Sequence, residues 1–116
     1  MKHDAYRMSL LFDYYGALLA PKQRSYFDLY YNQDLSLAEI AEGEGISRQG
    51  VHDTIGRAEA LLLDCERAAG CVARQARFRE AAERIGRAAR GLGQHPDASV
   101  RMAAEEILAA LSDVKE

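Results

Sequence analysis

The chain has 116 residues, enough for one small domain with an additional helical segment. Apolar residues make up 48 % of it and charged residues 28 %, a composition that permits both a packed core and a well-solvated surface. The net charge is −3, which disfavours strong DNA binding, because proteins that hold nucleic-acid backbones are usually basic. Neither an 18-residue apolar run nor a basic-then-apolar start occurs, so we expect a cytoplasmic protein without membrane insertion.

Helical periodicity begins near the N-terminus and predicts two helices before residue 32. The first helix should end near Ala20, with a core-facing stripe in which Phe12 is fully buried, made of Met8, Leu11, Phe12, Tyr15, Leu18 and Leu19. Pro21 suits the first turn of a second helix, which we expect to reach Tyr31. Its inward side chains would be Tyr26, Phe27 and Tyr30, and a polar turn would follow at Asn32, Gln33 and Asp34.

The segment from Leu35 to Leu62 has the layout of a helix-turn-helix. Ser36 and Glu39 form a capping box that starts a short helix, and Gly45 can adopt the left-handed conformation of a tight turn. Ala41 is small enough for two helices to cross closely, and Ser47 caps the second of them. The inward stripe of that second helix would be Val51, Ile55, Ala58 and Leu62.

The exposed start of that second helix is a candidate nucleic-acid-binding surface. A recognition helix contacts base edges with side chains near its N-terminus, and the candidates here are Arg48, Gln49, His52 and Arg57. Asp53 lies among them and would repel phosphate. The alternative interpretation is an ordinary solvated surface, and the nearly neutral charge of this face favours that alternative.

Beyond Gly70 the composition changes to alanine and arginine, and two amphipathic helices are predicted. Apolar residues repeat every seven positions in the first of these helices, at Cys71, Phe78, Ile85 and Leu92, with Ala82 and Ala89 between them. Gly91, Gly93 and Pro96 should end it. A last helix starts near Asp97, with its stripe at Val100, Ala104, Ile107, Leu111 and Val114. We therefore predict an all-α fold with two domains, a helix-turn-helix unit at residues 1–70 and a helical hairpin at residues 71–116.

The hairpin suggests two further properties. Its apolar stripes exceed what two helices can bury between them, so we expect a homodimer in which the hairpin is the dimerisation element. The first of its helices also carries arginines away from the apolar stripe, at Arg77, Arg84 and Arg87. These could contact phosphates or an acidic protein, or they could form a solvated face that offsets the acidic first domain.

The residues of catalytic chemistry are not arranged in any recognisable pattern. Carboxylate pairs, Cys–His spacings and a glycine-rich phosphate loop are all missing from the sequence, so we expect no enzyme and no cofactor. Cys65 and Cys71, the two cysteines, lie far from the three histidines, and this spacing does not predict a metal site. Both thiols are expected to be half-buried on helices.

Residues 8–62 resemble the YlxM family of helix-turn-helix proteins, and residues 35–62 are similar to region 4 of bacterial sigma factors. The matching pieces are Leu-Phe-Asp-Tyr-Tyr at 11–15, Lys-Gln-Arg at 22–24, Tyr-Tyr at 30–31, Leu-Ser-Leu-Ala-Glu-Ile-Ala at 35–41 and Ile-Ser-Arg-Gln at 46–49. The sequence departs from the family at Ala20, where a hydroxyl cap is commoner. Gly50 and Gly56 stand where the family more often has alanine and lysine, so the recognition helix loses a positive charge.

The resemblance implies a non-enzymatic accessory or regulatory factor of the signal recognition particle, touching its GTPase or its RNA. For the family this role is inferred from genes that lie beside those of the GTPase or its receptor. A DNA-binding transcriptional regulator is the second hypothesis, and a purely structural dimeric adaptor is the third.

Overall fold

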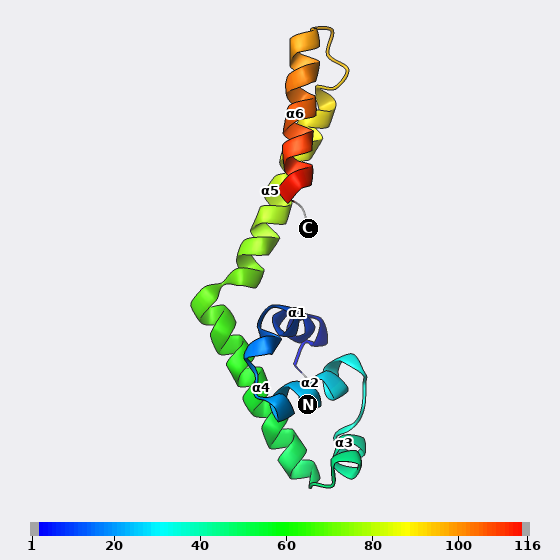
Figure 1. Ribbon diagram of the computed structural model, residues 1–116, viewed down its shortest axis with the longest axis vertical. Helices are drawn as coiled ribbons and strands as arrows, with labels where there is room; N and C mark the ends of the chain where they lie inside the picture. Colours follow the sequence, from blue (N-terminus) through cyan, green and yellow to red (C-terminus); the bar gives the residue numbers. More distant parts are fainter. Residues whose placement is uncertain (1–2, 115–116) are drawn as a thin grey trace. The chain divides into compact units, whose positions relative to one another are not determined.

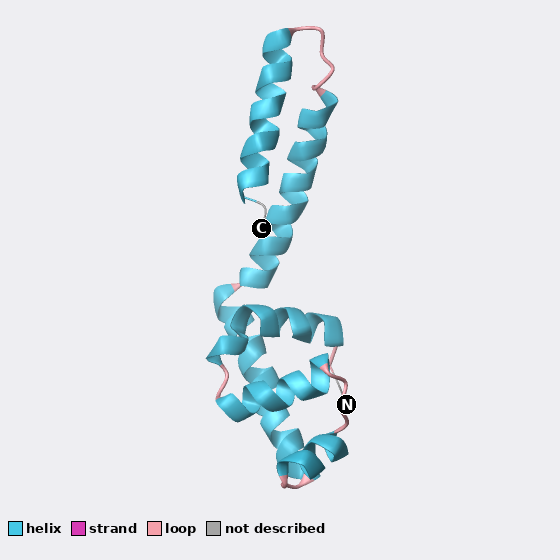
Figure 2. Cartoon of the chain, turned by 45° about the vertical axis from the view of Figure 1, so that its right-hand side comes forward, coloured by secondary structure: helices cyan, strands magenta, loops and turns pink. Residues whose placement is uncertain are grey.

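The computed structural model describes residues 3–114, and within that range the chain forms helices, turns and loops with no strand (Figures 1 and 2). The predicted all-α fold is confirmed. The α-helices are α1 (Ala5–Tyr15), α2 (Pro21–Phe27), α3 (Leu37–Glu44), α4 (Arg48–Ala69), α5 (Cys71–Gly91) and α6 (Ala98–Val114). The chain divides into two compact units, Met1–Val72 and Ala73–Glu116. Gly70 ends α4 in the left-handed conformation, with φ of 65°.

The first unit is built on α4, against which α1, α2 and α3 all pack. Every residue of the predicted α4 stripe is buried, because the 3.6-residue period keeps them on one side of the helix. The other buried side chains of this core are Met8, Leu11, Tyr15, Leu19, Tyr26, Phe27, Tyr31, Ile40 and Ala41. Cys65 and Cys71 are half-buried at its edge, as expected.

Two expectations for the first helix are wrong. Leu18 is 66 % exposed, because α1 ends at Tyr15 and a 3₁₀ turn over Gly16–Leu18 rotates the chain before Leu19 returns to the core. Phe12 is half-buried at the border of the core, where its ring stacks on that of Phe27 with centroids 4.9 Å apart. The helical period that predicts the stripe therefore does not continue through the 3₁₀ turn.

The second helix also ends differently from a regular α-helix. After Phe27 the chain forms a π-helical turn over Asp28–Asn32, closed by the N–H of Gln33 donating to the carbonyl oxygen of Asp28 at 3.0 Å. The wider turn brings Tyr31 into the core, whereas the regular period had favoured Tyr30, which is half-buried. Asp34 follows with a positive φ of 59°.

The second unit is a helical hairpin of α5 and α6, which lie side by side in both views (Figures 1 and 2). The predicted heptad seam is wrong for its large side chains, because Phe78, Ile85 and Leu92 are 41 %, 48 % and 43 % exposed, but right for Ala82 and Ala89, which are buried. The buried residues of α5 are Ala82, Gly86 and Ala89, and the buried residue of α6 is Ala104. Small side chains let the two helices approach closely, so the contact forms on the alanine side of the apolar stripe and leaves the larger side chains at its edge.

The stripe of α6 is rotated in the same way. Ala104 is buried and Val100 and Leu111 are half-buried, but Ile107 and Val114 are 40 % and 54 % exposed. Leu108, which the predicted stripe left out, is half-buried instead. The breaks between the helices are as expected: α5 ends at Gly91, and the carboxylate of Asp97 accepts the N–H of Ser99 at the start of α6.

Candidate nucleic-acid interface

The turn between α3 and α4 has the backbone of a helix-turn-helix. The N–H of Glu39 donates to the hydroxyl of Ser36 and the N–H of Ser36 donates to the carboxylate of Glu39, which confirms the capping box. The bond from Ser36 also lowers the pKa of the Glu39 carboxyl. Gly45 has φ of 69°, the left-handed conformation expected of it. Ala41, at the crossing, is 6 % exposed.

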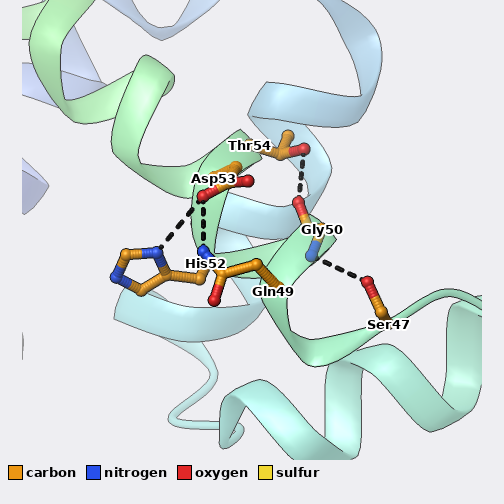
Figure 3. A network of polar contacts seen from close by, with 6 residues as sticks. All are labelled: Ser47, Gln49, Gly50, His52, Asp53 and Thr54. Atoms are coloured by element: carbon orange, nitrogen blue, oxygen red, sulfur yellow. Dashed lines mark hydrogen bonds and ion pairs between the residues drawn. The ribbon is translucent and has the colours of Figure 1, made fainter.

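The start of α4 is fixed by its own cap. The hydroxyl of Ser47 accepts the N–H of Gly50 at 3.0 Å, and the hydroxyl of Thr54 donates to the Gly50 carbonyl oxygen at 2.9 Å (Figure 3). A Cβ at position 50 would lie 3.2 Å from the Ser47 hydroxyl oxygen, a tight contact. The glycine therefore leaves room for the capping hydroxyl, a reason that the sequence alone did not reveal.

The four candidate side chains of α4 are all exposed, and a carboxylate joins two of them. The side-chain amide of Gln49 donates to Asp53 at 2.8 Å, and Nδ1 of His52 lies 3.5 Å from the same carboxylate oxygen (Figure 3). Arg48 and Arg57 are exposed at the start of the helix and one turn beyond Asp53. The structure thus brings Gln49, His52 and Asp53 together as one polar cluster.

This cluster limits what α4 can read. A glutamine recognises adenine by donating from its amide nitrogen and accepting at its amide oxygen, but one of the two N–H donors of Gln49 already points at Asp53 and fixes the direction of the amide. The Asp53 carboxylate adds a negative charge to the middle of the face. Residues 1–70 carry seven lysines and arginines against eleven aspartates and glutamates, a net charge of −4. Their field opposes the approach of phosphates.

Two buried tyrosine hydroxyls hold α4 in place, and the sequence analysis did not find them. Tyr31 donates to the carboxylate of Glu59 on α4 and accepts the N–H of His3. Tyr15 donates to Glu66 at 2.6 Å and accepts the N–H of Cys71 at 3.0 Å. Burial, followed by the bond to glutamate, raises the pKa of both hydroxyls. The only available signal was a tyrosine at a core position, which commonly finds a polar partner.

The arginine candidates lie on α5, in the second unit. Arg77, Arg84 and Arg87 are exposed on the side of α5 that points away from α6, and we call these three side chains the arginine face. The sequence pattern alone predicts that these arginines lie opposite Phe78 and Ile85. Because the buried contact is rotated toward Ala82 and Gly86, the arginine face lies opposite that contact and borders the exposed apolar side chains. The one recorded ion pair of this face joins Arg87 to Glu83, with nitrogen and oxygen 3.9 Å apart.

Comparison with known proteins shows to which family this chain belongs. A family model described as "UPF0122: Putative helix-turn-helix protein, YlxM / p13 like" matches residues 2–95. The chain belongs to this family. It is 47 % identical over 85 residues to the UPF0122 protein of Geobacillus kaustophilus, a match that covers 73 % of this chain and 77 % of the relative. It is also 60 % identical over 60 residues to the UPF0122 protein of Clostridium kluyveri, covering 52 % and 54 %.

The family match includes both candidate surfaces and stops before α6. Residues 2–95 contain the whole helix-turn-helix and the arginine face on α5, whereas α6 begins at Ala98. The family description agrees with the resemblance found in the sequence. Among residues 3–114, no helix has the length and apolarity to cross a bilayer, and no group of histidine, cysteine and carboxylate side chains could hold a metal ion.

Proposed function

We propose that this protein is a non-enzymatic accessory factor of the signal recognition particle in the cytoplasm, and that it contacts the particle's RNA through the arginine face of α5. The observation that carries the proposal is the contrast between the two candidate surfaces. The face of α4 has Asp53 at its centre and belongs to a unit of net charge −4, whereas α5 carries six arginines and two glutamates. The choice of the signal recognition particle as the partner rests on the family resemblance, and the choice of α5 as the binding surface rests on the charge contrast.

The spacing of the arginine face suits a phosphate backbone. A rise of 1.5 Å per residue sets the backbones of Arg77 and Arg84 about 10.5 Å apart, with Arg87 about 4.5 Å further along. Long guanidinium side chains at such intervals can reach successive phosphates of a folded RNA, and each offers the planar pair of donors that phosphate oxygens accept. The acidic first unit would repel the same RNA, which favours binding along α5.

The first prediction tests this surface. Changing Arg77, Arg84 and Arg87 together to glutamine should weaken binding to signal recognition particle RNA, because three phosphate contacts are lost. A plot of log affinity against log salt concentration should also become flatter, by about 0.7–0.9 for each lost contact. Fluorescence anisotropy of labelled RNA, titrated at several salt concentrations, measures both effects.

A matched variant controls for net charge. Arg7, Arg24 and Arg79 are also exposed, and changing these three to glutamine removes the same charge from other surfaces. This control should keep most of the affinity and of the salt dependence. Light scattering of both triple variants separates lost assembly from lost RNA contact. If the two variants weakened RNA binding equally, only general charge would matter and the proposed surface would be wrong. If the wild-type protein did not bind the RNA at all, the RNA contact would be excluded and the GTPase of the particle would remain as the proposed partner.

A specific observation favours DNA reading as the second candidate function. The helix-turn-helix is complete, with both caps formed and all four candidate side chains of α4 exposed. In that case Gln49 would turn its second amide N–H and its amide oxygen to a base, or Asp53 would itself accept from a cytosine amino group. A transcriptional regulator of this kind would depend on α4 rather than on α5.

The second prediction distinguishes this candidate. If α4 reads DNA, Arg48→Ala and Gln49→Ala should each weaken binding to a preferred sequence by about 1–3 kcal/mol while changing binding to random duplex much less, since base contacts carry specificity. Asp53→Asn should strengthen binding to random duplex, because it removes a negative charge from the face. Selection of bound sequences from a random pool, followed by competition titrations, measures all three. No enrichment of any sequence by the wild type would exclude this function.

A further inference from the structure

The hairpin unit has too small a core to stand by itself. Between residues 73 and 114 the fully buried positions are Ala82, Gly86, Ala89 and Ala104, none with a side chain larger than a methyl group. Units of about 40 residues usually need a metal, a disulfide or a partner chain to fold stably. No metal cluster exists in the described residues, and neither cysteine lies in this unit. A partner surface is the remaining means of stabilisation.

Apart from Met102, on the outer side of α6, the large apolar side chains that the hairpin leaves exposed gather on one of its faces. In an antiparallel pair, helix positions that lie on the same side of the contact share one face of the pair. Gly86 and Arg90 of α5 line a groove together with Leu108 and Ser112 of α6, which defines one face. The opposite face, which we call the apolar face, carries Phe78, Ile85, Leu92, Ile107 and Val114 with small alanines between them. It is slightly hollowed beside Ile85, between Ala81, Arg84 and Ala88.

The two edges of the apolar face have opposite charges. On the helical wheel, Arg77 and Arg84 follow the apolar side chains at the outer edge of α5, and Glu106 and Asp113 do so at the outer edge of α6. All four side chains are exposed. The groove on the other face shows that Gly86 and Arg90 pass α6 at the level of Leu108 to Ser112, so Arg84 lies close to the level of Asp113.

We propose that the apolar face binds a second copy of the same chain, forming a four-helix bundle around a two-fold axis parallel to the helices. This rotation sets α5 of one subunit on α6 of its partner, with Ile85, Leu92 and Ile107 in the shared core. The basic edge of each subunit then meets the acidic edge of the other at Arg84, which faces the partner subunit's Asp113 and keeps further N–H donors for a phosphate. Arg77 and Arg87 lie outside this contact. A two-fold axis across the helices would instead set arginine edge against arginine edge, which charge repulsion disfavours.

Assembly is tested first at the centre of the apolar face. The full chain at micromolar concentration should sediment with a mass of about twice 12.9 kDa, and Ile85→Asp should return it to 12.9 kDa. Arg79→Glu, on the opposite side of the same helix, should keep the dimer. Tyrosine fluorescence of each variant checks that the first unit, which holds all six tyrosines, remains folded. A monomeric wild type, or an Ile85→Asp variant that stays dimeric, would overturn the proposal.

A charge exchange then tests the arrangement of the helices. Arg84→Glu alone and Asp113→Arg alone should each weaken the dimer, because each creates two contacts between like charges. Mixing the two variants should restore it, since both cross-subunit pairs of the mixed dimer again join opposite charges. The dissociation constant of the mixture should approach that of the wild type, and those of the separate variants should be several-fold higher. If mixing gave no recovery, α5 would not lie on the partner's α6.

Discussion

Replacing Phe27 with alanine is expected to lower the free energy of unfolding of the first unit by about 3–5 kcal/mol. Its ring is fully buried and stacks between the rings of Phe12 and Tyr31, with centroids 4.9 Å and 4.5 Å away. Truncation removes the transfer free energy of the ring and leaves a cavity that three helical segments cannot collapse to fill. The six tyrosines all lie between residues 6 and 31, so urea unfolding followed by tyrosine fluorescence reports on this unit alone.

Phe12→Ala is the matched comparison for that experiment. The same ring is removed from the other side of the same stack, but Phe12 is only half-buried, so less apolar surface returns to water and less cavity forms. We expect its loss to be clearly smaller than that of Phe27→Ala. Equal losses would mean that Phe12 is as buried as its position in the apolar stripe predicts, which would contradict its place at the border of the core.

Leu62→Ala should have the second large effect, about 2–5 kcal/mol on the same unfolding transition. Leu62 lies in the middle of α4, has no exposed surface and belongs to the cluster that joins α4 to the helices of the first unit. Losing it creates a cavity at the centre of the unit. The measurement is again the urea midpoint from tyrosine fluorescence, with a constant slope confirming that the unfolded state is unchanged.

The adjacent Leu61 provides a control with the same change of residue. Its side chain is 36 % exposed on the other side of α4, so Leu61→Ala should cost far less than Leu62→Ala. Both variants keep α4 equally helical, because alanine has a higher helix propensity than leucine. A loss at Leu61 as large as that at Leu62 would show that its face of α4 is covered in solution, and the first unit would need a further partner.

The features that depend on local chemistry could be predicted from the amino-acid sequence alone. The caps at Ser36 and Ser47, the left-handed Gly45 and the stripe of α4 were all predictable, because each needs a particular residue at a particular distance along the chain. The candidate residues of α4 could be found in the same way. The family also followed from the sequence, since its motifs lie in the segments that form α1 to α4.

Which side of each helix is buried depends on how the helices pack, and this could be seen only in the three-dimensional structure. The period of 3.6 residues cannot reveal the 3₁₀ turn that exposes Leu18 or the π-helical turn that buries Tyr31, because both depend on how neighbouring helices pack. Nor could it choose between the two sides of the α5 stripe, where close approach through Ala82 and Gly86 leaves Phe78 and Ile85 outside. The Gln49–Asp53 bond likewise required rotamers that the sequence does not specify. Spacing along a chain defines a face, but the packing of a second helix decides which part of that face is buried.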